Sequence, residues 1–246
     1  LIDFCNKIDI EFISTAYDAD SVRFLKDLGV KKIKTASADL IDLTIHKKIV
    51  ECGLEPIVAV GMASFKEISQ TMEIYNGYIF RPTLLHCVSN YPCKHSSINL
   101  SVLEKIAEKF NVPIGYSDNS IGSEAAMLSV AYGASIIEKH FTFDKSMKGP
   151  DHSASSTPEE MIKLINDVNL AIKIIGTPQK TLQEEEKGMH SFSRKSIHTK
   201  CEVNNGDEFT EDNIYLLRPG NGIPANELDL IIGKKSTRNL PAYKML

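Results

Sequence analysis

Apolar, β-branched runs alternate with amphipathic stretches along the first 176 residues of the chain. Six runs are strand-like, and they lie at residues 9–16, 31–37, 56–61, 78–87, 112–117 and 134–140. Each run precedes a stretch in which apolar residues recur at helical spacing. Strands that alternate with helices in this way predict βαβ units and a parallel sheet covered on both faces.

Capping signals mark the starts of two of the predicted helices. Ser64 with Glu67 forms one capping-box pattern, and Thr157-Pro158 followed by Glu160 forms another. The long helix after Thr157 is expected to bury one face, made of Met161, Leu164, Ile165, Val168, Ile172 and Ile175. At the start of the chain, Leu1, Phe4, Cys5 and Ile8 are spaced as one face of a helix already under way, so we expect a fragment whose beginning is missing.

Nearly every predicted strand ends in polar residues. This feature helps to choose between an open doubly wound sheet and a (β/α)8 barrel. An open sheet that binds a dinucleotide should carry a GxGxxG turn, which the sequence lacks. The strand ends are instead Ser14-Thr15, Lys34 with Ser37, His86-Cys87, Ser117-Asp118-Asn119 and Glu138-Lys139-His140. Such ends meet on one face of a (β/α)8 TIM barrel, where the active site lies. We therefore predict a TIM barrel that lacks its first two βα units.

The pattern changes after Gly176. Residues 177–191 are polar and predict a linker, whereas 1–176 form the partial barrel. Residues 192–246 contain short strand-like runs and turn signals, and they predict a small β-rich domain.

Composition excludes several classes of protein. The net charge is −4 and no Lys/Arg stripe is present, which argues against nucleic-acid binding. No apolar run reaches the roughly 20 residues of a membrane helix. The five cysteines form no CxxC pair and no signal peptide is visible, so we expect a reduced, cytoplasmic protein.

Lys34 and His140 are the leading candidates for chemistry. Lys34 with Ser37 suits a phosphate or a carboxylate, although a solvated lysine fits the sequence equally well. His140 fits a metal ligand, a general base or a structural histidine, with Asp118 and Asn119 as neighbouring oxygen donors. Glu138 and Lys139 are expected to pair with adjacent helices, and Cys87 is expected to pack in the barrel.

Two loops carry further candidates. The first loop is a rigid turn with an acid near its end, Lys148-Gly149-Pro150-Asp151-His152. The second would fix an arginine in a position to bind an anion, and its residues are Arg218-Pro219-Gly220-Asn221-Gly222. When each loop is taken alone, a plain surface turn is the preferred interpretation of it.

Taken together, six motifs resemble the sialic acid synthase family. They are FISTAYD, KIKTAS, LLHCVSNYP, GYSDNSIG, IEKHFTFD with GPDH, and RPGNGI, and they follow one another in order. The family includes N-acetylneuraminate, legionaminic acid and pseudaminic acid synthases. The resemblance extends to a C-terminal SAF (antifreeze-like) domain.

The resemblance implies a cytoplasmic, metal-dependent transferase of carbohydrate biosynthesis that forms a C–C bond. Phosphoenolpyruvate would condense with an N-acylated hexosamine, either N-acetylmannosamine or a 2,4-diacetamido-6-deoxy analogue. The products would be a nine-carbon 2-keto acid and phosphate. A divalent metal, Mn2+ or Mg2+, would polarise the sugar aldehyde. The partner of the chain would be a second copy in a domain-exchanged homodimer.

The family's site residues carry over position by position. The phosphoenolpyruvate-binding positions correspond to Thr15, Lys34, Ser37, Ser89 and Ser117. His140 and Asp118 correspond to catalytic positions, and His140 with Asn119 to the metal ligands. Tyr91, Asp151 and Arg218 correspond to sugar contacts, the arginine reaching into the partner's barrel.

Several positions depart from the family pattern. Asn119 stands where the family usually has a second histidine ligand, and an amide adds no charge and is a weaker donor. Ala59-Val60 replaces a Ser-Thr pair, Val88-Ser89 a Thr-containing pair, and Ala38-Asp39 a Gly-Glu pair. Each lost hydroxyl would weaken anion binding by about 1–3 kcal/mol. The alternative function is therefore a diverged, weakly active or inactive paralogue that acts as a sugar- or anion-binding protein.

Overall fold

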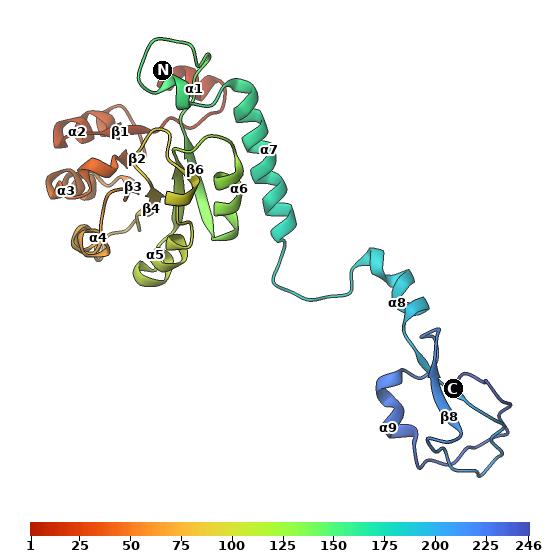
Figure 1. Cartoon of the computed structure of the whole chain (residues 1–246). Helices are drawn as coiled ribbons and strands as arrows, with labels where there is room; N and C mark the ends of the chain where they lie inside the picture. The colour runs from red at the N-terminus through yellow and green to blue at the C-terminus, as the bar shows by residue number, and fades with distance from the viewer. The chain divides into compact units, whose positions relative to one another are not determined.

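The computed structural model describes all 246 residues and divides into two compact units, Leu1–Gly176 and Thr177–Leu246 (Figure 1). The first unit is built on a parallel sheet. Its strands are β1 (Ser14–Ala16), β2 (Lys32–Thr35), β3 (Glu55–Ala59), β4 (Thr83–Cys87), β5 (Ile114–Asp118) and β6 (Ala134–Lys139). Each strand pairs with the next one along the chain, in the order β1-β2-β3-β4-β5-β6. This consecutive order is the strand order of a TIM barrel.

One helix follows each strand, and these helices lie around the outside of the sheet in Figure 1. They are α2 (Ala19–Asp27), α3 (Leu43–Cys52), α4 (Phe65–Met72), α5 (Val102–Phe110), α6 (Glu124–Ala131) and α7 (Pro158–Ile175), and a further helix, α1 (Ile2–Lys7), precedes β1. The predicted alternation is confirmed. β1 and β4 begin five residues later than expected, at Ser14 and Thr83. Asp9 has a left-handed backbone, and Pro82 lacks the N–H that a strand donates, so the chain is interrupted before each strand.

Alternate strand residues face opposite sides of the sheet. Outward residues such as Ile33, Val58 and Leu84 are fully buried against the helices. The inward residues Ile57, Ala59 and Leu85 form a separate cluster with Ile136 of β6. β6 pairs only with β5, so the contact of its Ile136 with β3 and β4 requires the sheet to curl into part of a barrel.

Gly115 makes this inward cluster possible. A Cβ atom at Gly115 would lie 2.4 Å from Leu85 Cδ2 and 2.6 Å from the carbonyl oxygen of Ile136. Any larger residue would therefore push β4 and β6 apart.

Both predicted capping boxes are confirmed, at Ser64/Glu67 and at Thr157/Glu160 with Pro158 in the first turn. The predicted buried face of α7 is wrong in part. Leu164 and Ala171 are buried, whereas Ile165, Ile172 and Ile175 are about half exposed. α6 is the element that packs against α7, and it covers only this narrow strip.

The second unit begins with a polar stretch that contains α8 (Lys187–Ser193), partly within the segment expected to be a linker. β7 (Ser196–Thr199) and β8 (Ile214–Leu217) form an antiparallel pair, and α9 (Leu228–Ile231) follows. Their core is Ile197, Val203, Phe209, Ile214 and Leu240. All five cysteines of the chain are free thiols. None of the helices is both long and apolar enough to span a bilayer.

Candidate active site

A cavity of about 480 Å³ lies at the carboxyl ends of the six strands. Every strand contributes one inward side chain to its wall, namely Thr15, Lys34, Ala59, Cys87, Ser117 and Glu138. These residues form the next layer above the inward cluster of Ile57, Leu85 and Ile136. The curl of the sheet therefore brings together side chains that are up to 123 residues apart, between Thr15 and Glu138.

The cavity contains seven of the candidate residues. They are Thr15, Lys34, Ser37, Ser89, Tyr91, Ser117 and His140. Four other candidates do not line the cavity. They are Asp118, Asn119, Asp151 and Arg218, of which Arg218 belongs to the second unit.

Lys34 forms an ion pair across the curled sheet. Its Nζ lies 3.3 Å from Oε1 of Glu138, although three strands separate β2 from β6 in the sheet. The Lys34 side chain is 16% exposed and that of Glu138 is 37% exposed. The expectation that Glu138 pairs with an adjacent helix is wrong, because the residue faces the interior of the curl rather than the helices.

Two hydroxyl groups converge near the end of β3. The N–H of Gly61 donates to Ser37 Oγ at 3.0 Å. A Cβ atom at Gly61 would lie 2.8 Å from Ser37 Oγ and 2.5 Å from Ser89 Oγ, so only glycine leaves room for both hydroxyls. Hydroxyl donors beside a lysine suit an anion. Gly61 was not among the residues predicted from the sequence; its position two residues beyond inward Ala59 is the signal that could have identified it.

Asp118 and Lys139 face the opposite side of the sheet from the cavity floor. Lys139 Nζ donates to Asp118 Oδ2 at 2.7 Å, and their side chains are 4% and 0% exposed. Oδ1 of Asp118 accepts from the backbone and hydroxyl of Ser120. The strand period of two explains this placement, because Ser117 faces inward and the next residue must face outward. Lys139 pairs with this strand end and not with a helix, contrary to expectation.

Asn119 is engaged in hydrogen bonds to protein atoms. Its Nδ2 donates to the carbonyl of Val88 at 2.9 Å and to Cys87 Sγ at 3.2 Å, and the residue is buried. No group of three or more His, Cys, Asp or Glu side chains is arranged to hold a metal ion. Mn2+ and Mg2+ favour carboxylate oxygens, yet Glu138, the acidic residue in the cavity wall, already pairs with Lys34. The imidazole of His140 and the carboxylate of Glu138 are the groups in the cavity wall that suit a divalent metal.

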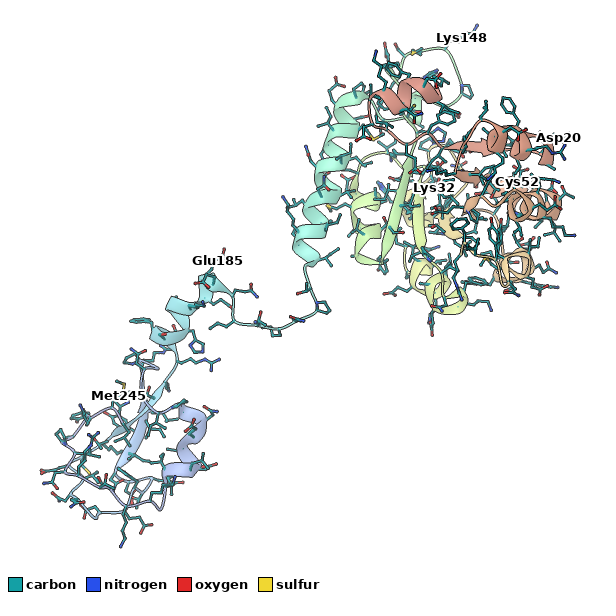
Figure 2. All side chains as sticks on the ribbon, turned by 180° about the vertical axis from the view of Figure 1, so that it is seen from behind. Asp20, Lys32, Cys52, Lys148, Glu185 and Met245 are labelled. Carbon is teal, nitrogen blue, oxygen red and sulfur yellow. The ribbon has the colours of Figure 1, made fainter.

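His140 packs against Tyr91 at the mouth of the cavity. Their ring centroids are 4.9 Å apart and the rings are nearly perpendicular, at 82°. Burial raises the pKa of the Tyr91 hydroxyl, and the negative charges of Asp151 and Glu138 raise it further. Asp151 is therefore close enough to act on Tyr91 electrostatically, although it does not line the cavity. It belongs to the loop after β6, on which Lys148 projects away from the first unit in Figure 2.

The buried pair of Asp118 and Lys139 generates a stability prediction. Asp118→Asn should lower the free energy of unfolding by about 3–5 kcal/mol, because it leaves the Lys139 ammonium buried without a counter-charge. Urea unfolding followed by circular dichroism measures the change. Glu108→Gln, which breaks the exposed Lys105–Glu108 pair, is the matched control and should cost less than about 1 kcal/mol. Equal effects of the two substitutions would contradict the structural role of Asp118.

Comparison with known proteins gives matches over both units. Residues 1–180 match the NeuB family, and residues 194–242 match the SAF domain. The N,N'-diacetyllegionaminic acid synthase of Legionella pneumophila is 35% identical over 247 residues, which cover 98% of this chain and 69% of that protein. The enzyme of the same name from Campylobacter jejuni is 36% identical, over 97% of this chain and 72% of that protein.

A solved structure is similar as well. The crystal structure of the N-acetylneuraminic acid (sialic acid) synthetase from Leptospira borgpetersenii matches with a TM-score of 0.73 and 36% identity. The match covers 76% of this chain and 66% of that chain. The names of these proteins share one chemistry, the synthesis of an acidic sugar.

Proposed function

The chain belongs to the NeuB family, and on that basis we propose that it condenses phosphoenolpyruvate with an N-acylated hexosamine. The products are a nine-carbon 2-keto acid and inorganic phosphate. The acceptor is N-acetylmannosamine or a 2,4-diacetamido-6-deoxy analogue, since relatives are named for sialic acid and for diacetyllegionaminic acid.

The cavity at the strand ends is the observation that supports this proposal most. Lys34 supplies a positive charge, and Ser37 and Ser89 supply hydroxyl donors that meet over the bare Cα of Gly61. Phosphoenolpyruvate carries a phosphate and a carboxylate, and it needs this combination of charge and directed hydrogen bonds. Thr15 and Ser117 add further hydroxyls to the same wall. The cavity retains an anion-binding character although Ala59 and Val60 contribute no hydroxyl.

In the proposed reaction, C3 of phosphoenolpyruvate attacks the aldehyde carbon of the open-chain sugar and forms the new C–C bond. The former aldehyde oxygen takes up a proton, and water adds to C2 with loss of a proton. The bond between C2 and the phosphate oxygen then breaks and phosphate leaves with the bonding electrons, while the C2 hydroxyl loses its proton and becomes the keto oxygen. The cavity wall holds the anion, and Tyr91 with His140 at the mouth is placed to contact the sugar. Asp118 acts only as a positioning residue, through Ser117 and Lys139.

The activity is tested by phosphate release. With phosphoenolpyruvate present and Mn2+ supplied, addition of either acceptor sugar should release phosphate, measured by a coupled colorimetric assay. Lys34→Met should lower kcat/KM roughly 100-fold, the loss of about 3 kcal/mol for a charged contact. The matched control is Lys32→Met, on the same strand (Figure 2), because Lys32 pairs with Glu11 at 2.9 Å outside the cavity.

Two results would contradict the proposed reaction. If Lys34→Met kept the activity of Lys32→Met, the anion would not bind at Lys34. If the chain bound both ligands without releasing phosphate, it would be the sugar- or anion-binding paralogue. The buried amide of Asn119, which donates to the Val88 carbonyl and to Cys87 Sγ, is the observation that favours this second candidate.

The requirement for Mn2+ or Mg2+ stays a prediction, and Asn119 offers a test of it. Asn119→His should bind Mn2+ at least about tenfold more tightly, roughly 1.4 kcal/mol, because imidazole is the better donor. Isothermal titration calorimetry measures the affinity, and His140→Ala in the same background should abolish the gain. An unchanged affinity would mean that position 119 does not reach the metal.

The homodimer also stays a prediction, with Arg218 as the expected contact to the partner's cavity. Arg218 is exposed in the second unit, and its Nε donates to the carbonyl of Ser193 at 2.7 Å. This bond holds the base of the guanidinium group against α8, and the exposed end of the group remains available to an anion or to sugar hydroxyls.

A further inference from the structure

Lys34, which faces the cavity, and Lys139, which faces the other side of the sheet, both have carboxylate partners. Lys139 is paired with buried Asp118 at 2.7 Å, and Lys34 is paired with Glu138 at 3.3 Å. The formal charges cancel within each pair, so the wall of the free protein offers no uncompensated lysine to an anion. An anion that binds at Lys34 must therefore compete with the Glu138 carboxylate for the ammonium group.

The two lysines differ in how firmly their partners are held. Asp118 is fully buried and accepts three further hydrogen bonds, from Ser120 and from the Tyr116 hydroxyl. The Glu138 carboxylate has no partner besides Lys34, and the side chain is 37% exposed. Its carboxylate can consequently move into solvent without leaving a buried group unpaired. The ammonium of Lys34, which is only 16% exposed, has much less freedom to leave.

The Lys34–Glu138 ion pair lies in the same cavity as the hydroxyl donors. Lys34, Ser37 and Ser89 line the same cavity as Glu138, so a phosphate group that accepts from the hydroxyls lies beside the glutamate. Two anionic groups within one cavity repel one another. Phosphate binding therefore opposes the Lys34–Glu138 pair.

We propose that Glu138 is an internal competitor that occupies Lys34 in the free protein and is displaced when the phosphate group of the substrate binds. The proposal rests on the proposed function in its choice of phosphate as the anion. Glu138 then sets the affinity of the cavity for anions. It favours groups of high charge, such as a phosphate dianion, over singly charged carboxylates. A single charge attracts Lys34 less strongly and therefore offsets less of the attraction that is lost when the ion pair breaks.

A fixed structural role for Glu138 predicts the opposite result. If the carboxylate served to hold Lys34 in place for the substrate, removing its charge would loosen Lys34 and weaken anion binding. The sign of the change in affinity therefore separates competition from positioning, and the measurement does not depend on turnover.

The test is the binding of inorganic phosphate to the whole chain, measured by isothermal titration calorimetry. Glu138→Gln keeps the shape of the side chain and removes its charge, and it should tighten phosphate binding about three- to tenfold. Glu108→Gln changes the net charge equally at an exposed pair outside the cavity, and should bind phosphate as the unchanged protein does. Lys34→Met should abolish binding with or without Glu138→Gln.

Glu138→Asp gives a second, independent variant should the glutamine variant fold poorly, as judged by its thermal unfolding. The shorter side chain keeps the charge but withdraws it from Lys34, so binding should tighten by a smaller factor. Unchanged or weaker phosphate binding in a folded Glu138 variant overturns the competitor proposal alone. Phosphate binding that survives Lys34→Met overturns the placement of the anion site, and with it the proposed function.

Discussion

The inward layer of Ile57, Ala59, Leu85 and Ile136 is the contact on which the site depends. These side chains fill the inside of the curl, and Gly115 lets Leu85 approach the backbone of β6. The curl in turn brings the inward residues at the strand ends to one cavity. Without this layer, Lys34 on β2 and Glu138 on β6 would lie on distant strands of a flat sheet.

Because side chains alternate along each strand, neighbouring residues face opposite sides of the sheet and have different roles. Ser117 and Glu138 face the cavity, whereas Asp118 and Lys139, the next residues in the chain, form a buried pair on the other side. β5 and β6 are thus joined outside the cavity by an ion pair and lined inside by a hydroxyl and a carboxylate. The stable outer pair holds in place the strand ends that carry the more exposed inner groups.

Much of the fold could be predicted from the sequence, because its signals are local. Strand and helix alternation, the two capping boxes and the polar strand ends all depend on residues within a few positions of each other. The exposure of Ile165 and Ile172 on α7 could not be predicted from the helix alone, since it depends on how much of the helix α6 covers. The fold and the family could therefore be predicted more accurately from the sequence than the burial of individual helix faces.

The site was predictable as a set of residue types but not as a set of partners. Lys34, Ser37 and His140 were identified, yet the partner of Lys34 lies 104 residues away and is reached only through the curl. The direction of Asp118 was missed because a polar cluster at a strand end does not reveal which member faces inward. Gly61 was missed because its contribution is the space that a side chain would otherwise fill.

Zero-length crosslinking tests the central claim most directly, that the curled sheet brings β2 and β6 together at the cavity. A water-soluble carbodiimide joins a carboxylate to an amine only where the two are in contact, and the joined peptides are identified by mass spectrometry. We predict a crosslink between Lys34 and Glu138, with Lys105–Glu108 as the positive control. A crosslink at the control pair without one between Lys34 and Glu138 would contradict the account.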